Sequence, residues 1–142
     1  MSSRRAAAPG ESGGGSPPLG VILAGGLGTR LRSVVADRPK PLVEVAGRPF
    51  LVYLLEQLAE AGFHRVVLCT GYLGEQVPAA LGSAYRGMQL RYSQEPSPLG
   101  TAGALRHALP VLDSSAVLVL NGDSYCRVDV GAFCRWHAVR PW

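Results

Sequence analysis

The chain of 142 residues is predicted to form an α/β domain with a mostly parallel sheet and helices on both faces. Three apolar runs, LGVILA, RVVLCT and AVLVL, have the composition of buried strands, and LGVILA is typical of a strand buried on both faces. Segments with helical periodicity separate the three runs. This alternation predicts parallel strands joined by right-handed crossovers.

The domain is expected to occupy residues 19–142, after a disordered tail over residues 1–18. The tail is rich in Ser, Gly, Pro and Ala and lacks large apolar residues. It therefore cannot bury enough surface to offset the entropy cost of ordering. At Leu19 the composition changes abruptly to the first strand.

A strand and two helices are predicted in the next part of the chain. Leucines at helical spacing between Pro49 and Gly62 predict an amphipathic helix, which Gly62 would end in a left-handed conformation. Residues 65–70 predict a strand. Residues 74–81 predict a short helix whose regularity Pro78 limits.

The later segments continue the alternation. Residues 88–93 alternate as a strand does, and Thr101 is predicted to cap a helix. The residues expected on one side of that helix are Leu105, Ala108 and Leu109. A strand over residues 116–120 runs into Asn121-Gly122-Asp123, and a last helix is expected over residues 130–139.

Composition restricts the function classes. The net charge is +4, but no Lys or Arg run is interleaved with aromatic residues, so nucleic acid is not expected as a partner, whereas a polyphosphate is compatible. The three cysteines form no CxxC pair, and we expect core residues of a reduced, cytoplasmic protein. No apolar run is long enough for a membrane span. The three histidines lack metal-ligand spacing.

Glycines and basic residues follow the first strand, where parallel sheets bind ligands. Residues 24–32, AGGLGTRLR, combine backbone amides with a hydroxyl and two guanidinium groups, which indicates phosphate binding. The segment is not a P-loop, because no Lys-Ser or Lys-Thr follows its last glycine. It is not a dinucleotide fingerprint either, because Leu31 stands where the third glycine should be.

Lys40 is flanked by two prolines, Pro39 and Pro41. The prolines fix the backbone, and we expect them to deny the lysine helix or sheet partners. An ammonium presented in this way suits an anion. Taken alone, the lysine would more often be a solvated loop residue, but the preceding glycine segment favours the functional interpretation.

The segment GGLGTRLRSVVADRPKPLVEVAGRPFL resembles the signature of the sugar-1-phosphate nucleotidyltransferases, a family with a Rossmann-like catalytic domain. EPSPLGTAGAL and NGD follow in the family's order, so the resemblance runs from Leu19 to about Val130. Within the family it is similar to the heptose 1-phosphate and mannose-1-phosphate guanylyltransferases, which implies GTP. Uridylyltransferases share some of these segments, so the base stays open.

The resemblance implies joining of a nucleoside triphosphate to a sugar 1-phosphate with release of pyrophosphate, and no covalent enzyme intermediate. The catalytic residues it implies are Arg30, Lys40 and Asp123. Asp123 would also ligate Mg²⁺. The nucleotide-binding residues it implies are Ala24, Gly25, Gly26, Gly28, Thr29, Arg30, Glu95, Gly100, Thr101, Asn121 and Gly122.

The extent of the chain departs from the family pattern, since family domains continue well beyond the NGD segment. We therefore expect a truncated part of the catalytic domain, with an exposed sheet edge that favours aggregation or a partner. A catalytically incomplete nucleotide-binding or regulatory module is the alternative, and a dinucleotide-dependent oxidoreductase is a weaker one. Homo-oligomerisation stays open, and supply of activated sugars for polysaccharide synthesis is expected by analogy.

Overall fold

The computed structural model describes residues 18–26 and 37–140. The predicted tail over residues 1–18 lies outside them except for Pro18, and so do Gly28, Thr29 and Arg30 of the glycine segment. None of the helices in the described part of the chain has the length and apolar character that crossing a bilayer requires.

Five strands form the main sheet, in the order β5-β6-β4-β1-β7. Their bounds are β1 Leu19–Ala24, β4 Arg65–Thr70, β5 Ala84–Tyr85, β6 Met88–Gln94 and β7 Val117–Asn121. β1, β4, β6 and β7 are parallel to one another, and only the short β5 pairs antiparallel, with β6. The prediction of a mostly parallel α/β sheet is therefore confirmed.

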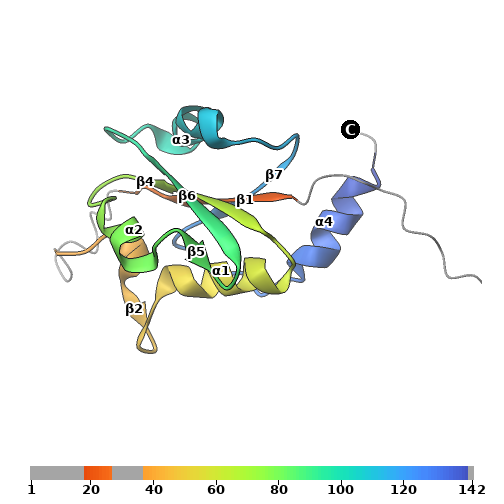
Figure 1. The fold of residues 1–142 in the computed structure, drawn as a ribbon, viewed down its shortest axis with the longest axis horizontal. Coiled ribbons are helices and arrows are strands. Elements are labelled where there is room, and N and C mark those ends of the chain that lie inside the picture. Colours follow the sequence, from red (N-terminus) through yellow and green to blue (C-terminus); the bar gives the residue numbers. More distant parts are fainter. Residues whose placement is uncertain (1–17, 27–36, 141–142) are drawn as a thin grey trace, which may run out of the picture.

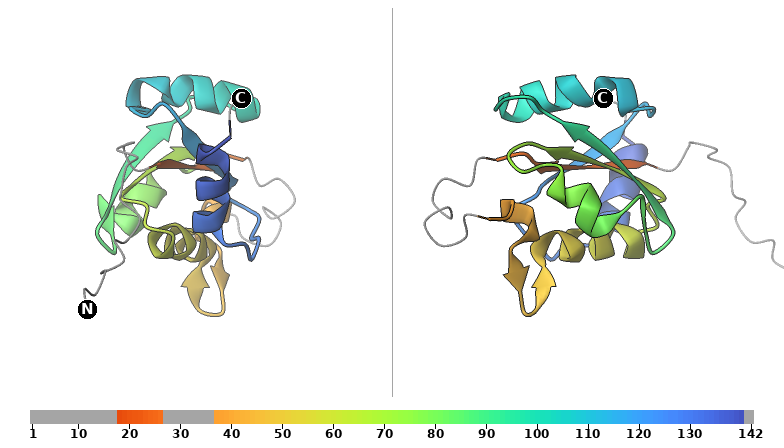
Figure 2. Two further views of the ribbon diagram at one scale, coloured as in Figure 1. Left: turned by 90° about the vertical axis from the view of Figure 1, so that its right-hand side faces the viewer. Right: turned by 60° about the vertical axis from the view of Figure 1, so that its left-hand side comes forward.

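Helices cover both faces of this sheet (Figures 1 and 2). The α-helices are α1 Phe50–Glu60, α2 Gln76–Leu81, α3 Gly100–Ala108 and α4 Val130–Ala138, and the short 3-10 helices are η1 Lys40–Leu42 and η2 Leu109–Val111. α1 and α3 lie on opposite faces in both figures. A small hairpin of β2 Glu44–Val45 and β3 Arg48–Pro49 precedes α1.

The two faces of β1 and β4 bury separate apolar clusters. Ile22 and Leu68 point to the α1 side, where Leu51, Leu54, Leu55 and Leu58 of the helix complete the larger cluster. Val21 and Val67, one residue along each strand, pack with Ala108 of α3 in the smaller cluster. All four strand residues are fully buried, as expected for the central strands of a parallel sheet. Gly62 has a φ of 84° after α1, which confirms the predicted left-handed end.

The structure corrects three predictions about burial. Leu109 is 61% exposed, because α3 ends at Ala108 and the backbone turns into η2, which contains Pro110. The cysteines differ from one another: Cys69 is buried as predicted, Cys134 is half-buried and Cys126 is exposed. β7 was expected from its apolar run, but Val117 and Val119 are each 37% exposed because the strand lies at the edge of the described sheet.

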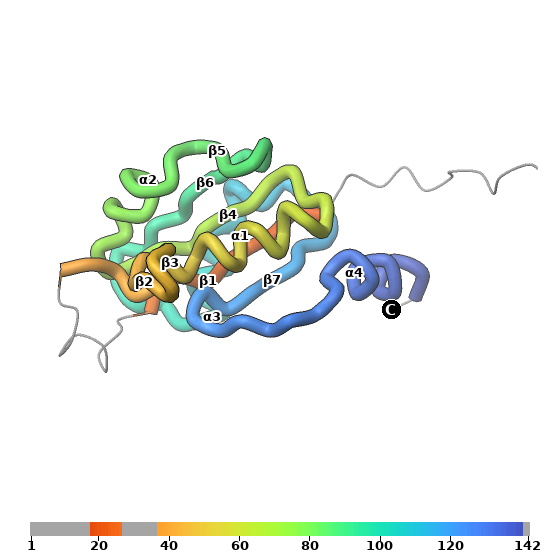
Figure 3. Tube along the Cα trace, turned by 90° about the horizontal axis from the view of Figure 1, so that it is seen from below, coloured from red at the N-terminus to blue at the C-terminus, as the bar shows by residue number. Residues whose placement is uncertain are grey.

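The chain after β7 runs back along α1 to α4 (Figure 3). Gln57 of α1 donates side-chain hydrogen bonds to the carbonyls of Cys126 at 2.7 Å and Val128 at 3.3 Å. Val130 and Cys134 of α4 then reach the larger apolar cluster. A few contacts therefore fix the segment that follows Asp123.

Candidate functional site

The strand order of the sheet reverses at β1. β4 and β6 lie on one side of β1, and the chain then returns to place β7 on the other side. In open parallel sheets, ligands bind at the carboxyl ends of the strands beside such a reversal. A pocket of about 410 Å³ lies at this point, lined by the last residues of β1 and β7 and by the segments that follow them.

The pocket brings together every predicted site residue that the structure describes. These residues are Ala24, Gly25, Gly26, Lys40, Glu95, Gly100, Thr101, Asn121, Gly122 and Asp123. Gly28, Thr29 and Arg30 were predicted as well, and they lie outside the described residues. Segments about 100 residues apart in the sequence thus share one concave surface, although this placement does not test the role of any of them.

The floor of the pocket depends on a close approach between the ends of β1 and β7. The Gly122 amide donates a hydrogen bond of 2.8 Å to the Leu23 carbonyl. A Cβ at Gly122 would lie 2.7 Å from that carbonyl oxygen and 3.1 Å from the Ala24 Cα. Glycine is therefore required where β7 ends, and the chain can turn there to present Asp123.

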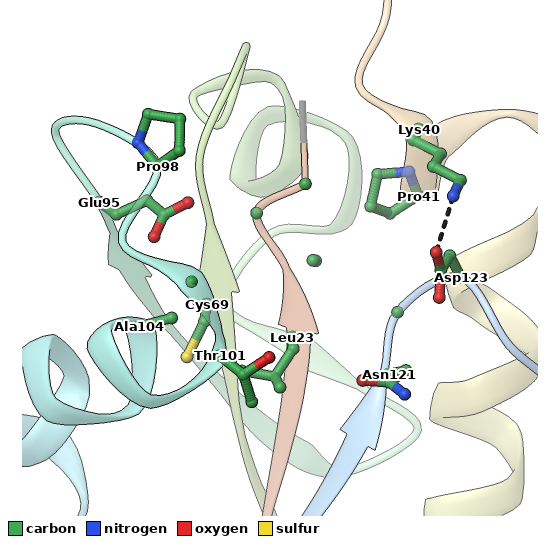
Figure 4. Close-up of a pocket in the computed structure, with 15 residues that line it drawn as sticks. Leu23, Lys40, Pro41, Cys69, Glu95, Pro98, Thr101, Ala104, Asn121 and Asp123 are labelled. Atoms are coloured by element: carbon green, nitrogen blue, oxygen red, sulfur yellow. Dashed lines mark hydrogen bonds and ion pairs between the residues drawn. The ribbon is translucent and has the colours of Figure 1, made fainter. Parts of the chain in front are cut away.

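Glu95 and Thr101 form one wall of the pocket (Figure 4). The Glu95 backbone amide donates to the Thr70 carbonyl at 2.9 Å, which fixes the residue beyond the end of β6. Its carboxylate accepts a hydrogen bond from the Leu99 amide at 3.2 Å. A Cβ at Gly25 would lie 2.7 Å from Glu95 Oε1, so this glycine leaves room for the carboxylate.

A second pocket of about 430 Å³ lies on the other side of Glu95. Gly25, Glu95 and Pro98 line both pockets, and Tyr72 and Ser97 belong to the second one. The Glu95 side chain therefore stands between two concave surfaces.

Thr101 does not cap α3, contrary to the sequence prediction. The helix begins at Gly100 with Leu99 at the cap position, and no side chain caps it. Because α3 begins at Gly100, Thr101 lies inside the first turn, and the Leu99 amide before it donates to the Glu95 carboxylate. The Thr101 side chain lines the pocket instead (Figure 4).

The opposite wall carries the pocket's ammonium and a carboxylate (Figure 4). Lys40 Nζ lies 2.7 Å from Asp123 Oδ2, across 83 residues of sequence. The hydrogen bond from Lys40 lowers the pKa of the Asp123 carboxyl below its usual value, against a smaller opposing effect of burial. The carboxylate is therefore ionised at neutral pH and its charge is compensated inside the protein.

The structure corrects the prediction that the flanking prolines exclude Lys40 from a helix. Lys40 is the first residue of η1, and Pro41 follows it. A proline in the first turn of a helix loses nothing, because the amide at that position has no intrahelical partner. The prolines instead fix the turn that directs Lys40 toward Asp123.

Two contacts of this wall were not predicted. The Ser124 hydroxyl donates a hydrogen bond of 3.2 Å to Asp123 Oδ1, and Gln57 fixes the segment beyond it through Cys126 and Val128. A serine directly after the acid was a visible signal for the first contact. Nothing in the sequence relates Gln57 to residues about 70 positions away.

A magnesium ion would find one carboxylate on this wall, that of Asp123. Glu95 belongs to the opposite wall, and the described part of the chain contains no group of three or more His, Cys, Asp or Glu side chains that could hold a metal ion. Magnesium in phosphate-transferring sites is commonly held by one or two carboxylates together with substrate phosphates and waters. The donor set fits that kind of site and does not fit an all-protein cage.

The family model for nucleotidyl transferases matches residues 19–140. The chain belongs to this family. Among curated relatives, the D-glycero-alpha-D-manno-heptose 1-phosphate guanylyltransferase of Aneurinibacillus thermoaerophilus is 42% identical over 110 residues, which are 78% of this chain and 48% of the relative. The N-acetylmuramate alpha-1-phosphate uridylyltransferase of Neisseria meningitidis is 44% identical over 115 residues, covering 79% of this chain and 49% of that protein.

Solved structures agree with the fold. A crystal structure of HddC from Yersinia pseudotuberculosis complexed with GMP-PN has a TM-score of 0.75 and 37% identity. The match covers 86% of this chain and 55% of that one. The chain thus spans about half the length of the curated relatives it matches, and it shares their Rossmann-like nucleotidyltransferase fold over that length.

Proposed function

We propose that this chain contributes the nucleotide-binding part of an enzyme that transfers a nucleotidyl group to a sugar 1-phosphate. The observation that carries the proposal is the pocket at the reversal of strand order, with glycine backbone at its floor and Lys40 and Asp123 on one wall. Such a pocket supplies what this chemistry requires, namely alignment and charge neutralisation without a protein nucleophile.

In the proposed reaction, an oxygen of the sugar phosphate attacks the α-phosphorus of the triphosphate in line with the leaving group. A new P–O bond forms as the bond between the α-phosphorus and the bridging oxygen breaks, and pyrophosphate departs. Lys40 would neutralise charge on the reacting phosphates. Arg30, outside the described residues, is proposed to act on the triphosphate because of the family resemblance.

Asp123 is proposed to bind Mg²⁺ together with the nucleotide phosphates. The ion would neutralise negative charge on the triphosphate and orient it. The Asp123 carboxylate lies beside Lys40, on the wall where phosphate charge would accumulate. Ser124 would orient that carboxylate through its hydrogen bond to Oδ1.

We propose guanine as the preferred base, because the Glu95 carboxylate lies on the wall opposite the phosphate-binding residues. An ionised carboxylate only accepts hydrogen bonds. Guanine offers two adjacent donors on one edge, N1–H and the N2 amino group, whereas uracil offers one N–H between two carbonyls. The relatives named as guanylyl and uridylyl enzymes have almost the same sequence identity to this chain, 42% and 44%. The choice of guanine is therefore argued from Glu95 and not from the names of the relatives.

A heptose or mannose 1-phosphate is the proposed second substrate, by analogy with the named relatives. Pyrophosphate release by the purified chain with Mg²⁺ tests both substrates at once. GTP, UTP, CTP, ATP and dTTP would each be combined with heptose, mannose and glucose 1-phosphates. Release that requires GTP and one sugar phosphate is expected, and release with every nucleotide equally would contradict the base assignment.

Glu95→Gln isolates the role of the carboxylate. Glutamine keeps the shape but replaces one acceptor by a donor, so GTP affinity is expected to fall about 10- to 100-fold while UTP affinity does not fall. Glu60→Gln, an exposed change in α1, is the matched control. Equal losses for GTP and UTP would show that Glu95 supports the pocket without reading the base.

A second candidate is a nucleotide-binding or regulatory module that does not turn over. It is favoured by the donor set of the pocket, because among the described lining residues Asp123 is the one carboxylate on the wall that carries Lys40. Tight nucleotide binding, with no pyrophosphate released for any substrate pair, would establish it.

A further inference from the structure

Each oxygen of the Asp123 carboxylate accepts one hydrogen bond from a protein donor in this structure. Lys40 Nζ lies 2.7 Å from Oδ2, and the Ser124 hydroxyl donates to Oδ1 at 3.2 Å. A divalent cation needs negatively charged oxygen that is free to coordinate. The ammonium of Lys40 therefore repels a cation that approaches Oδ2 and occupies one of the sites through which the carboxylate would coordinate it.

A free cation would gain little by displacing Lys40. Glu95, the other carboxylate among the described lining residues, belongs to the opposite wall. The cation would exchange one positive partner of Asp123 for another while an unpaired ammonium stayed nearby. Metal binding to the nucleotide-free pocket is therefore opposed by Lys40.

A triphosphate changes this balance, because it brings its own negative charges. Lys40 is 34% exposed at its side chain, and a lysine has a flexible four-carbon stem. Its ammonium can therefore rotate from Asp123 to a phosphate oxygen with little loss of packing. The carboxylate is then released for the metal that the phosphates also bind.

We infer that Lys40 is an exchangeable counter-ion: it pairs with Asp123 in the nucleotide-free pocket, keeps divalent metal off that carboxylate, and moves to the phosphates when nucleotide binds. This inference rests on the proposed function of the pocket. It means that metal and nucleotide bind with positive coupling, each raising the affinity for the other. It also gives the ion pair a role beyond joining η1 to the end of β7.

Mn²⁺ binding to the full chain, measured by electron paramagnetic resonance, tests the exchange without any turnover. The wild-type chain is expected to bind Mn²⁺ weakly alone and more tightly with a non-hydrolysable GTP analogue. Lys40→Met is expected to bind Mn²⁺ alone about fivefold more tightly, because the carboxylate loses its competing partner. The analogue should raise Mn²⁺ affinity less in this variant than in the wild type, because the carboxylate is already released.

Two further variants control the measurement. Lys40→Arg keeps the positive charge and should stay close to the wild type without nucleotide. Arg65→Met removes the 2.6 Å partner of Asp113, an aspartate outside the pocket that keeps only a longer contact of 3.8 Å with Arg91. An equal gain of Mn²⁺ affinity in Arg65→Met would overturn the inference, because any freed surface carboxylate would then behave in the same way.

The outcomes separate this inference from the function on which it rests. If Asp123→Asn weakens Mn²⁺ binding in the presence of nucleotide but Lys40→Met leaves Mn²⁺ binding alone unchanged, the exchange is wrong and the proposed site stands. If the analogue does not bind the wild-type chain, both are wrong. A tighter Mn²⁺ complex of Lys40→Met alone, together with a smaller gain of Mn²⁺ affinity on adding the analogue than in the wild type, supports both.

Discussion

The centre of the sheet and the segment after β7 are packed very differently. Val21 of β1 and Leu55 of α1 are completely buried, whereas Phe133 and Trp136 of α4 are each 48% exposed. Gly25 follows directly from the well-packed strand β1, while Asp123 follows the edge strand β7. The two walls of the pocket therefore differ in what fixes them: a core on one side, and a few polar contacts on the other.

The largest expected effect is the difference in unfolding free energy between a substitution in α1 and one in α4. Leu55→Ala removes a fully buried side chain from the larger cluster and should cost about 2–5 kcal/mol of unfolding free energy. Phe133→Ala loses a half-exposed ring that stacks on Trp136 at 6.4 Å, and should cost about 1 kcal/mol. Urea unfolding measures both changes. Equal costs would show that α4 is as much a part of the core as α1.

An added methyl group should change the unfolding free energy at one glycine of the pocket and leave it almost unchanged at another. Gly122→Ala places a Cβ 2.7 Å from the Leu23 carbonyl and should destabilise the fold by about 1–3 kcal/mol. The Cβ of Gly26→Ala meets no atom of the described residues within 4 Å, so unfolding free energy should change by less than about 0.5 kcal/mol. Loss of nucleotide binding in Gly26→Ala with unchanged stability would show that the ligand approaches this backbone closely.

Thiol labelling compares the centre of the sheet with the segment after β7 and needs no mutation. Burial, with a smaller contribution from the Glu95 charge, raises the pKa of the Cys69 thiol to about 11. Cys69 should therefore react with iodoacetamide at pH 8 on the order of 100-fold more slowly than an ordinary exposed thiol. Cys126, which is exposed after β7, should be labelled first. Mass spectrometry of peptides resolves the order, and fast labelling of Cys69 would mean that the β4 end opens readily.

The smallest expected effect concerns the hairpin before α1. A hydrogen bond from Arg48, 2.6 Å away, lowers the pKa of the Glu56 carboxyl. Because the pKa of the carboxyl is lower in the folded state, the ionised group stabilises the fold at pH values above the usual carboxyl pKa. This stability is lost as the pH falls through the lowered pKa. Acid unfolding of Glu56→Gln should therefore depend less on pH than that of the wild type. Glu60→Gln, an exposed change in the same helix, should behave like the wild type.

The central elements could be predicted from sequence because their patterns are local. The apolar runs of β1 and β4 and the leucine spacing of α1 specify buried surfaces wherever they occur. The hairpin of β2 and β3 could not be predicted, since each strand has two residues and its turn relies on positive φ at Ala46 and Gly47. The exposure of β7 was also hidden, because an apolar run looks the same at the centre and at the edge of a sheet.

The site was predicted through motifs, whereas its contacts were not. Glycine and proline signals marked residues 25–28 and 39–41. The rule that ligands bind at the carboxyl ends of strands correctly placed the described glycines Gly25 and Gly26 in one pocket with the NGD segment. The ion pair of Lys40 with Asp123 joins residues 83 positions apart, so only the fold brings it about. The same holds for the position of Glu95 between two pockets.

Nuclear magnetic resonance of the isotope-labelled chain, titrated with a non-hydrolysable GTP analogue and Mg²⁺, tests the central claim most directly. If the pocket at the reversal of strand order binds the nucleotide, the amide signals of Gly25, Gly26 and Gly122 should shift together with saturable dependence on ligand. Unchanged signals there, or shifts confined to the distant surface around Ala79 and Ala80, would contradict it.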